Sequence, residues 1–133
     1  MELRYLYLGS DDTGRDVAAW LALPGTGLRW WFRHFGADVA AIDPGSRPLL
    51  LVADHRPAGS VLPIYAVDDL DGTRTRLLEA GWGVAVSQAG TPEGPACVVS
   101  SPTGPAVALL RVDRPNAMDA AYADPSNTHR VLR

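Results

Sequence analysis

LPIYAVDDLD (62–71) has the same pattern as YLYLGSDD (5–12): a short apolar run with the character of a strand, ending in paired aspartates. The two stretches begin 57 positions apart (62 − 5 = 57). The same offset places PLLLVA (48–53) over PAVALL (105–110), where each copy ends. Because both ends match at one offset and only two copies exist, the sequence indicates a duplicated module rather than a solenoid.

Local signals divide each copy into one helix and four strands. The paired aspartates supply side-chain oxygens suited to a helix N-cap. Turns rich in Gly and Pro separate the apolar runs that follow the helix. The expected strands are 4–8, 28–35, 37–43, 47–54, 60–67, 83–88, 94–100 and 104–112, and the expected helices follow Asp12 to about Leu23 and run from Leu70 to Ala80. Each copy is therefore predicted to be a βαβββ module.

A βαβββ module buries one face of its strands beneath its helix and leaves the other face free. We therefore expect a single α+β domain over 1–133. Its two modules, about 3–57 and 60–114, should form a curved, cup-like eight-stranded mixed sheet with the helices outside and the inside left for a ligand. The C-terminal tail, 115–133, falls outside the repeat, and AMDAAY (117–122) is predicted to form one or two helical turns.

Composition limits the function classes. The chain has 133 residues, of which 47% are hydrophobic and 20% charged, as expected for one soluble globular domain. No apolar run approaches the roughly 18 residues of a membrane span, so no membrane partner is expected. The N-terminus lacks a secretory signal pattern, and the lone Cys97 excludes an internal disulfide, so we expect a cytoplasmic location. A net charge of −3 argues against nucleic-acid binding.

Two stretches of the second module resemble the vicinal oxygen chelate superfamily, which includes glyoxalase I, extradiol dioxygenases and bleomycin-resistance proteins. AVDDLDGTRTRLLEAGW (66–82) resembles that family's capped helix, and SPTGPAVALLRV (101–112) resembles its final turn and strand. The family's usual final stretch has Asp and Asn where this chain has Ser101 and Pro105. The resemblance covers residues 3 to about 114, and it implies the cup-like fold.

The resemblance also implies where a metal ion would bind. Metal-dependent members carry ligands, usually His and Glu, at the head of the first strand and in the last strand of each module. The matching positions here are Tyr5, Leu51, Leu62 and Ala108. A divalent ion needs several oxygen or nitrogen ligands, and one phenol with three hydrocarbon side chains does not supply them. We therefore expect a chain of the metal-free, bleomycin-resistance-like branch, with no metal and no cofactor.

Strand periodicity identifies the side chains expected to face a ligand, because alternate residues point to opposite faces. The inward positions are apolar apart from two phenols: Tyr5, Tyr7, Leu51, Leu62, Ile64 and Ala108. In LRWWFRHF (28–35), one face presents Trp30, Phe32 and His34, and the other presents Arg29, Trp31, Arg33 and Phe35. We favour Trp30, Phe32 and His34 as ligand-binding, since aromatic rings offer contact area to flat ligands; the alternative is that they pack beneath the helix.

The segment between the modules, DHRPAGS (54–60), contains the neighbouring pair Asp54 and His55. Its Pro and Gly residues are typical of a turn, so we interpret it as a solvated linker. Gating of the pocket is the alternative.

These expectations favour a metal-independent binding protein, without catalytic residues, that sequesters an aromatic or polycyclic natural product. The bleomycin-resistance-like members imply antibiotic self-resistance of this kind and a homodimer. The alternative is an enzyme acting on a natural-product intermediate by isomerase, lyase or cyclase chemistry, with Tyr5, Tyr7 or His34 as acid or base. A third possibility is a metal enzyme with displaced ligands, for instance His34, Asp54, His55 or Glu93.

Overall fold

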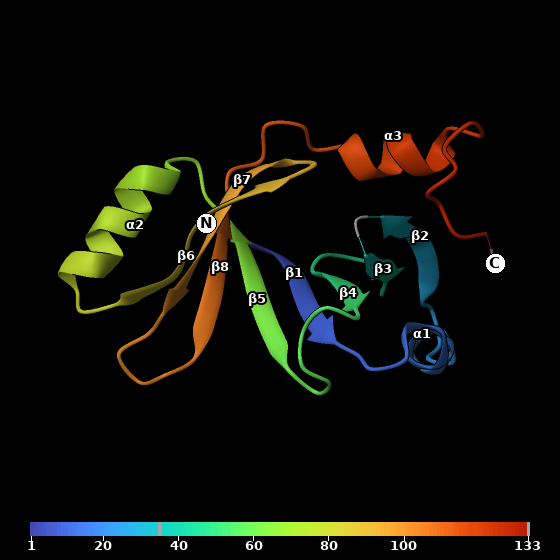
Figure 1. Cartoon of the computed structure of the whole chain (residues 1–133), viewed down its shortest axis with the longest axis horizontal. Helices are drawn as coiled ribbons and strands as arrows, with labels where there is room; N and C mark the ends of the chain where they lie inside the picture. Colours follow the sequence, from blue (N-terminus) through green and yellow to red (C-terminus); the bar gives the residue numbers. More distant parts are fainter. Residues whose placement is uncertain (35, 133) are drawn as a thin grey trace. The chain divides into compact units, whose positions relative to one another are not determined.

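The computed structural model describes residues 1–34 and 36–132. The strands form an eight-stranded mixed sheet with the order β2-β3-β4-β1-β5-β8-β7-β6. In chain order the elements are β1 (Glu2–Gly9), α1 (Thr13–Leu21), β2 (Gly27–His34), β3 (Ala37–Asp43), β4 (Leu49–Ala53), β5 (Val61–Ala66), α2 (Leu70–Glu79), β6 (Gly83–Thr91), β7 (Gly94–Ser100), β8 (Ala106–Leu110) and α3 (Ala117–Ala123) (Figure 1). The predicted α+β class and the two successive βαβββ modules are confirmed.

Most predicted elements appear close to their expected bounds. The first helix is shorter than expected, because it ends at Leu21 rather than near Leu23. The hydroxyl of Thr26 donates to the carbonyl oxygens of Trp20 and Leu23, so a side chain satisfies groups that a further helical turn would have used. The helix predicted in the tail is present as α3. The prediction for Phe35 lies outside the described residues.

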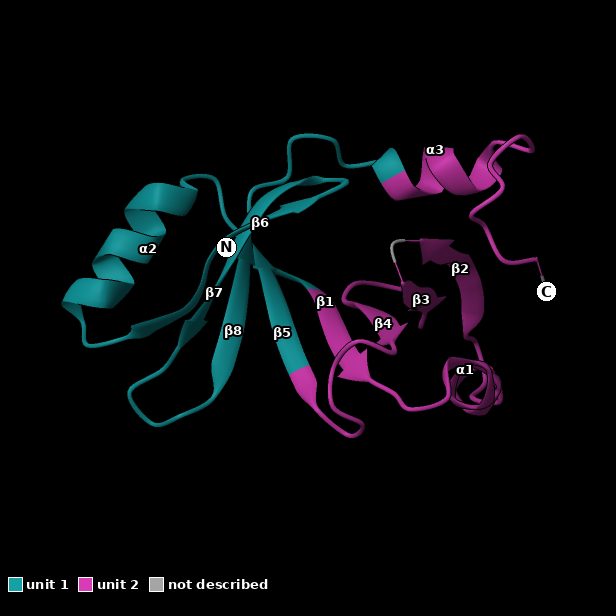
Figure 2. Ribbon diagram, in the orientation of Figure 1, with its two compact units in different colours: residues 1–4, 62–117 teal, residues 5–61, 118–133 magenta. Residues whose placement is uncertain are grey.

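The chain divides into two compact units (Figure 2). Unit 1 comprises residues 1–4 and 62–117, and unit 2 comprises residues 5–61 and 118–133. The C-terminal residues from Met118 onward therefore belong with the first module rather than with the second, which precedes them in sequence.

The repeated pattern appears as an identical register in the parallel ladder of each module. Tyr7 pairs with Leu51 in the parallel ladder of β1 and β4, and Ile64 pairs with Ala108 in the parallel ladder of β5 and β8. Adding the offset converts one pair into the other (7 + 57 = 64; 51 + 57 = 108). The first and last strands of each module are thus neighbours, and they pair in the same register in both modules.

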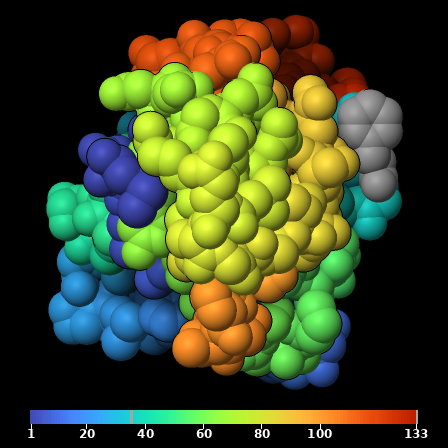
Figure 3. Space-filling model, turned by 90° about the vertical axis from the view of Figure 1, so that its left-hand side faces the viewer, coloured from blue at the N-terminus to red at the C-terminus, as the bar shows by residue number. Residues whose placement is uncertain are grey.

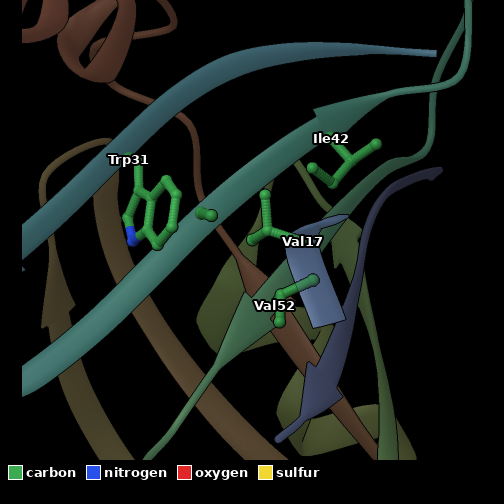
Figure 4. Close-up of a cluster of buried hydrophobic side chains, with 5 residues drawn as sticks. Val17, Trp31, Ile42 and Val52 are labelled. Atoms are coloured by element: carbon green, nitrogen blue, oxygen red, sulfur yellow. The ribbon is translucent and has the colours of Figure 1, made fainter. Parts of the chain in front are cut away.

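The helix of each module packs against one face of its own strands, and three of the five buried positions in each core are equivalent under the offset of the repeat. In unit 2 the core consists of Val17, Trp31, Ala40, Ile42 and Val52; Figure 4 shows four of these side chains gathered together. In unit 1 it consists of Val67, Leu70, Cys97, Val99 and Leu109. Ala40 and Cys97 occupy matching positions (40 + 57 = 97), and neither is exposed. Burial raises the pKa of the Cys97 thiol, so this residue is a core side chain rather than a nucleophile.

Both long helices start at the predicted aspartates. The carboxylate of Asp12 accepts the Arg15 amide at 3.0 Å, and that of Asp69 accepts the Gly72 amide at 2.9 Å. These two caps again differ by the offset of the repeat (12 + 57 = 69). The aspartates therefore cap helices, as their positions predicted.

Unit 1 buries one complete ion pair. The guanidinium of Arg4 donates to both carboxylate oxygens of Glu93, at 3.2 Å and 2.5 Å, and to the carbonyl oxygen of Pro115 at 3.3 Å. Arg4 is 7% and Glu93 4% exposed. A bidentate pair satisfies two charges that would otherwise be costly to bury. Glu93 is therefore committed to holding the β6–β7 turn against β1.

Strand β6 differs from the other strands because nearly all of its residues are exposed. Its apolar side chains Val84 and Val86 are 42% and 43% exposed. In Figure 3, α2 and β6 occupy much of the face turned toward the viewer. This strand is an open edge of the sheet, at the end of its strand order.

We predict that Asp12→Ala and Asp69→Ala each lower the free energy of unfolding by about 1 kcal/mol, the usual cost of losing an N-cap. Urea denaturation would measure the change. Asp68→Ala, one residue before the second cap, is the matched control and should stay within about 0.5 kcal/mol of the wild type. An equal loss at Asp68 and Asp69 would contradict the capping role.

Breaking the buried ion pair of Arg4 and Glu93 should lower the free energy of unfolding more than the loss of an N-cap does. Arg4→Met or Glu93→Met leaves one charged side chain buried without its partner in the pair, and we expect a loss of about 3–5 kcal/mol in unfolding free energy. The exposed pair of Arg111 and Asp113, 3.0 Å apart, serves as the control, and Arg111→Met should cost about 0–1 kcal/mol. The double variant Arg4→Met/Glu93→Met should recover most of the loss; a double variant as unstable as the single ones would refute the pairing.

Candidate functional site

The site with the clearest chemistry lies in unit 2, where the Tyr7 hydroxyl is 2.6 Å from Nε2 of His55. The two rings meet edge to face, with centroids 5.3 Å apart and an interplanar angle of 61°. Tyr7 is half-buried on β1, whereas His55 is exposed. A phenol and an imidazole at this separation form a proton-transfer pair that solvent and small molecules can reach.

Backbone contacts at both ends of the loop 54–60 hold His55 over Tyr7. At its start, Asp54 exchanges two hydrogen bonds with Asp38 of β3, since its carboxylate accepts the Asp38 amide at 2.9 Å and its own amide donates to the Asp38 carbonyl at 3.2 Å. At its end, the Gly9 amide donates to the Ser60 carbonyl at 2.9 Å. The loop is therefore pinned at both ends beside the C-terminal end of β1.

Burial raises the pKa of Tyr7 to about 12, with smaller opposing influences from Arg56, which lowers it, and Asp54, which raises it. The phenol therefore keeps its proton at neutral pH and can donate a hydrogen bond to Nε2 of His55 or to an oxygen atom of a ligand. With Nε2 as acceptor, the imidazole is neutral and able to take up a proton.

Arg56 adds a positive charge and a buried donor to this site. Its influence on the pKa of Tyr7 places the guanidinium near the phenol. Its Nε is buried and has no hydrogen-bond partner among the described residues. A buried donor without an acceptor is costly, and an oxygen atom of a bound ligand would satisfy it.

The positions that would carry a metal ion in the resembled family do not fit one. Leu51, Leu62 and Ala108 are buried hydrocarbon side chains. The Arg47 guanidinium lies over the Tyr5 ring, with its central carbon 5.4 Å from the ring centroid. This positive charge disfavours the binding of a metal cation beside Tyr5. Across residues 1–34 and 36–132, no three His, Cys, Asp or Glu side chains gather closely enough to hold a metal ion.

The aromatic residues of β2 divide as the strand period predicts. Trp31 packs beneath α1 with Val17, which assigns the opposite face to Trp30 and Phe32. Both are buried, and Phe32 contacts the ring of Tyr122 from α3 at a centroid distance of 6.3 Å. Their role in binding a ligand stays a prediction.

Other predicted site residues lie in different surroundings. His34 is exposed, and its Nδ1 lies 3.0 Å from Nδ1 of His129. Leu62, Ile64 and Ala108 belong to unit 1, whereas Tyr5, Tyr7 and Leu51 belong to unit 2. The structure thus joins Tyr7 to His55, which the sequence assigned to a linker. The parallel pairing of β1 and β4 could have predicted this contact. It brings the C-terminal ends of both strands to the same edge, so the loop after β4 starts beside the end of β1.

A separate hollow of about 460 Å³ lies in unit 1 and includes none of the predicted ligand-binding residues in its lining. Its lining residues are Met1, Glu2, Arg4, Ala66, Val67, Asp68, Arg111, Val112 and Asp113. The two arginines are already paired, Arg4 with Glu93 and Arg111 with Asp113.

No helix in the described part of the chain is both long and apolar enough to cross a membrane. No protein-family model matches the sequence, and no curated protein matches it.

Solved structures share the fold. Methylmalonyl-CoA epimerase from Mycobacterium tuberculosis is 14% identical with a TM-score of 0.71, covering 87% of this chain and 91% of its own. The Streptomyces coelicolor enzyme, solved with 2-nitronate-propionyl-CoA, is 12% identical with a TM-score of 0.67, covering 86% and 99%. A hypothetical protein from Bacillus halodurans is 9% identical with a TM-score of 0.72, covering 85% and 95%. Methylmalonyl-CoA epimerases belong to the vicinal oxygen chelate superfamily, so the chain has the fold of that superfamily.

The raised pKa of Tyr7 predicts a specific alkaline titration. The unfolded phenol ionises near its ordinary pKa of about 10, whereas folded Tyr7 ionises near about 12. Folding stability contributed by this group is therefore complete below about pH 10 and lost as the pH rises toward about 12. Tyr7→Phe should remove a step near pH 12 from the ultraviolet titration of the tyrosines. If Tyr7→Phe instead removed a step near the ordinary pKa of about 10, the raised pKa of Tyr7 would be contradicted.

Proposed function

We propose that the chain binds a small carbonyl compound, such as a natural-product intermediate, and moves a proton on it without a metal ion at the reacting atoms. His55 is the general base and Tyr7 the hydrogen-bond donor. The observation that carries the proposal is the 2.6 Å contact between the Tyr7 hydroxyl and Nε2 of His55. General acid–base pairs of this type contribute about 10²–10⁴-fold to rates.

The proton balance is complete with these two side chains. When the Tyr7 hydroxyl turns its hydrogen bond from Nε2 to the carbonyl oxygen, Nε2 of His55 is free to take a proton from the carbon next to the carbonyl group. The electron pair of the broken C–H bond forms a C=C bond, and the electron pair of the C=O double bond moves to the oxygen. The Tyr7 hydroxyl donates a hydrogen bond to this enolate, and its pKa of about 12 keeps the phenol protonated while it does so. Return of the proton from His55 to the same or a conjugated carbon completes an isomerisation.

Arg56 supports an anionic or strongly polar substrate. Its buried Nε lacks a partner, and a guanidinium is well suited to bind a carboxylate or an enolate oxygen. We therefore assign Arg56 to substrate binding and to electrostatic support of the negative charge that develops beside Tyr7.

The likeness to methylmalonyl-CoA epimerases supports isomerase chemistry, which the sequence analysis gave as the alternative function. At 12–14% identity this support extends to the fold and to the class of small molecule worth testing, and the substrate itself is left to experiment.

Sequestration of an aromatic natural product, the function that the sequence favoured, is the second candidate. The observation that favours it is the buried hydrocarbon at Leu51, Leu62 and Ala108, where metal-dependent relatives carry ligands. Under this candidate a homodimer would be the working form, and the ligand would leave unchanged.

A deuterium-exchange assay tests the proposal. The protein is incubated in heavy water with methylmalonyl-CoA and with aromatic β-keto thioesters, with and without a chelator, and deuterium in the recovered compound is measured by mass spectrometry. We expect exchange that the chelator does not reduce. His55→Gln and Tyr7→Phe should each slow it by about a hundredfold or more. Arg56→Met should mainly raise the KM.

Tyr65→Phe is the matched control, because it removes the same hydroxyl from the core of unit 1 and should leave exchange unchanged. Exchange at the wild-type rate in His55→Gln would refute the proton-transfer role. Recovery of a tightly bound compound without any deuterium would favour sequestration instead.

A further inference from the structure

The two remaining histidines of the chain, His34 and His129, meet outside the Tyr7–His55 site. Their Nδ1 atoms are 3.0 Å apart, and their ring centroids are 3.7 Å apart with an interplanar angle of 55°. Both residues are exposed. Since two neutral imidazoles can share a single hydrogen in such a contact, one Nδ1 must donate and the other accept.

The backbone brings these rings together independently of their own contact. The Arg33 amide donates to the His129 carbonyl at 2.8 Å, and the Val131 amide donates to the Trp31 carbonyl at 2.7 Å. The side chain of Asn127 accepts the His129 amide at 3.0 Å. Residues 129–131 thus lie antiparallel beside β2, and the backbone brings the two imidazoles to the same place before any ligand binds.

Side chains of α3 strengthen this attachment. Arg29 of β2 donates to both carboxylate oxygens of Asp119, at 2.9 Å and 3.1 Å. The Arg130 guanidinium donates to the carbonyl oxygen of Tyr122 at 2.8 Å. The segment that carries His129 is therefore fixed on both sides of that residue.

We propose that His34 and His129 bind a divalent transition-metal ion of the kind that favours imidazole, Zn²⁺ above all. Tetrahedral Zn–N bonds of about 2.0–2.1 Å place two ligand nitrogens about 3.3–3.4 Å apart. The observed separation is 3.0 Å, so a small outward turn of the two rings makes room for the ion. The ion takes the place of the shared hydrogen, which moves through solvent to Nε2 of the same ring, so that both imidazoles bind as neutral ligands. Because both rings are exposed, they can turn so that their lone pairs converge, and water completes the coordination.

The proposed ion would act as a clip, that is, a cross-link between His34 of β2 and His129 of the C-terminal segment. It would bind only when the segment lies on β2, so it would stabilise that arrangement by mass action. This role does not depend on proton transfer at His55. If zinc binding is absent, the proton-transfer proposal still stands, and the reverse is also true.

Zinc titration of the untagged chain tests the proposal. Calorimetry with Zn²⁺ alone should detect one site in the wild type, and His34→Gln or His129→Gln should weaken it by about tenfold or more, since even outer-shell changes often cost that much. Zn²⁺ should also slow hydrogen exchange at the amides of Arg33 and Val131, which bond across the clip. Circular dichroism would check that each variant is folded.

His55→Gln is the matched control, because it removes the third histidine and should leave the zinc affinity unchanged. Cu²⁺ provides a second measurement, since its electron paramagnetic resonance spectrum should show two imidazole nitrogens in the wild type and fewer in either variant. Absence of zinc binding in the wild type, equal losses in all three variants, or unchanged exchange at Arg33 and Val131 would overturn the proposal.

Discussion

The parallel pairing of the first and last strands in each module is the constraint on which the rest of the structure depends. β1 pairs with β4, and β5 with β8, in the same register. This pairing fixes which face of each strand meets the helix, because side chains alternate along a strand. A shift by one residue would exchange the core with the opposite face. The identical use of Ala40 and Cys97 in the two cores shows that the register has been retained in both copies.

The same pairing places the candidate site. Parallel neighbours end at the same edge of a sheet, so the loop that leaves β4 begins beside the end of β1. Tyr7 and His55 meet there although 48 positions separate them in sequence. The two copies differ at this point, since the position equivalent to Tyr7 is Ile64 (7 + 57 = 64). Duplication supplied the scaffold, and the polar pair is present in the first module alone.

Arg4 and Arg56 differ in how their buried donor groups are satisfied. Arg4 and Glu93 satisfy each other in unit 1, so the pair has a structural role. Arg56 has a buried donor without a partner, close to a phenol whose pKa is raised. Such an imbalance is costly in a purely structural region and is typical of a binding site. This contrast supports the proposed role of Arg56 in substrate binding.

The sequence by itself determined the repeated pattern, the βαβββ order, the capping of each helix by one of its paired aspartates and the absence of ligand-type side chains at Leu51, Leu62 and Ala108. These features depend on local pattern and spacing, which a single chain displays directly. Only the tertiary structure decided that His55 contacts Tyr7 and that His129 contacts His34. Both contacts join residues far apart in sequence through loops and a tail, where no periodicity indicates the fold. Their positions follow from strand pairing and from backbone hydrogen bonds formed after the chain has folded.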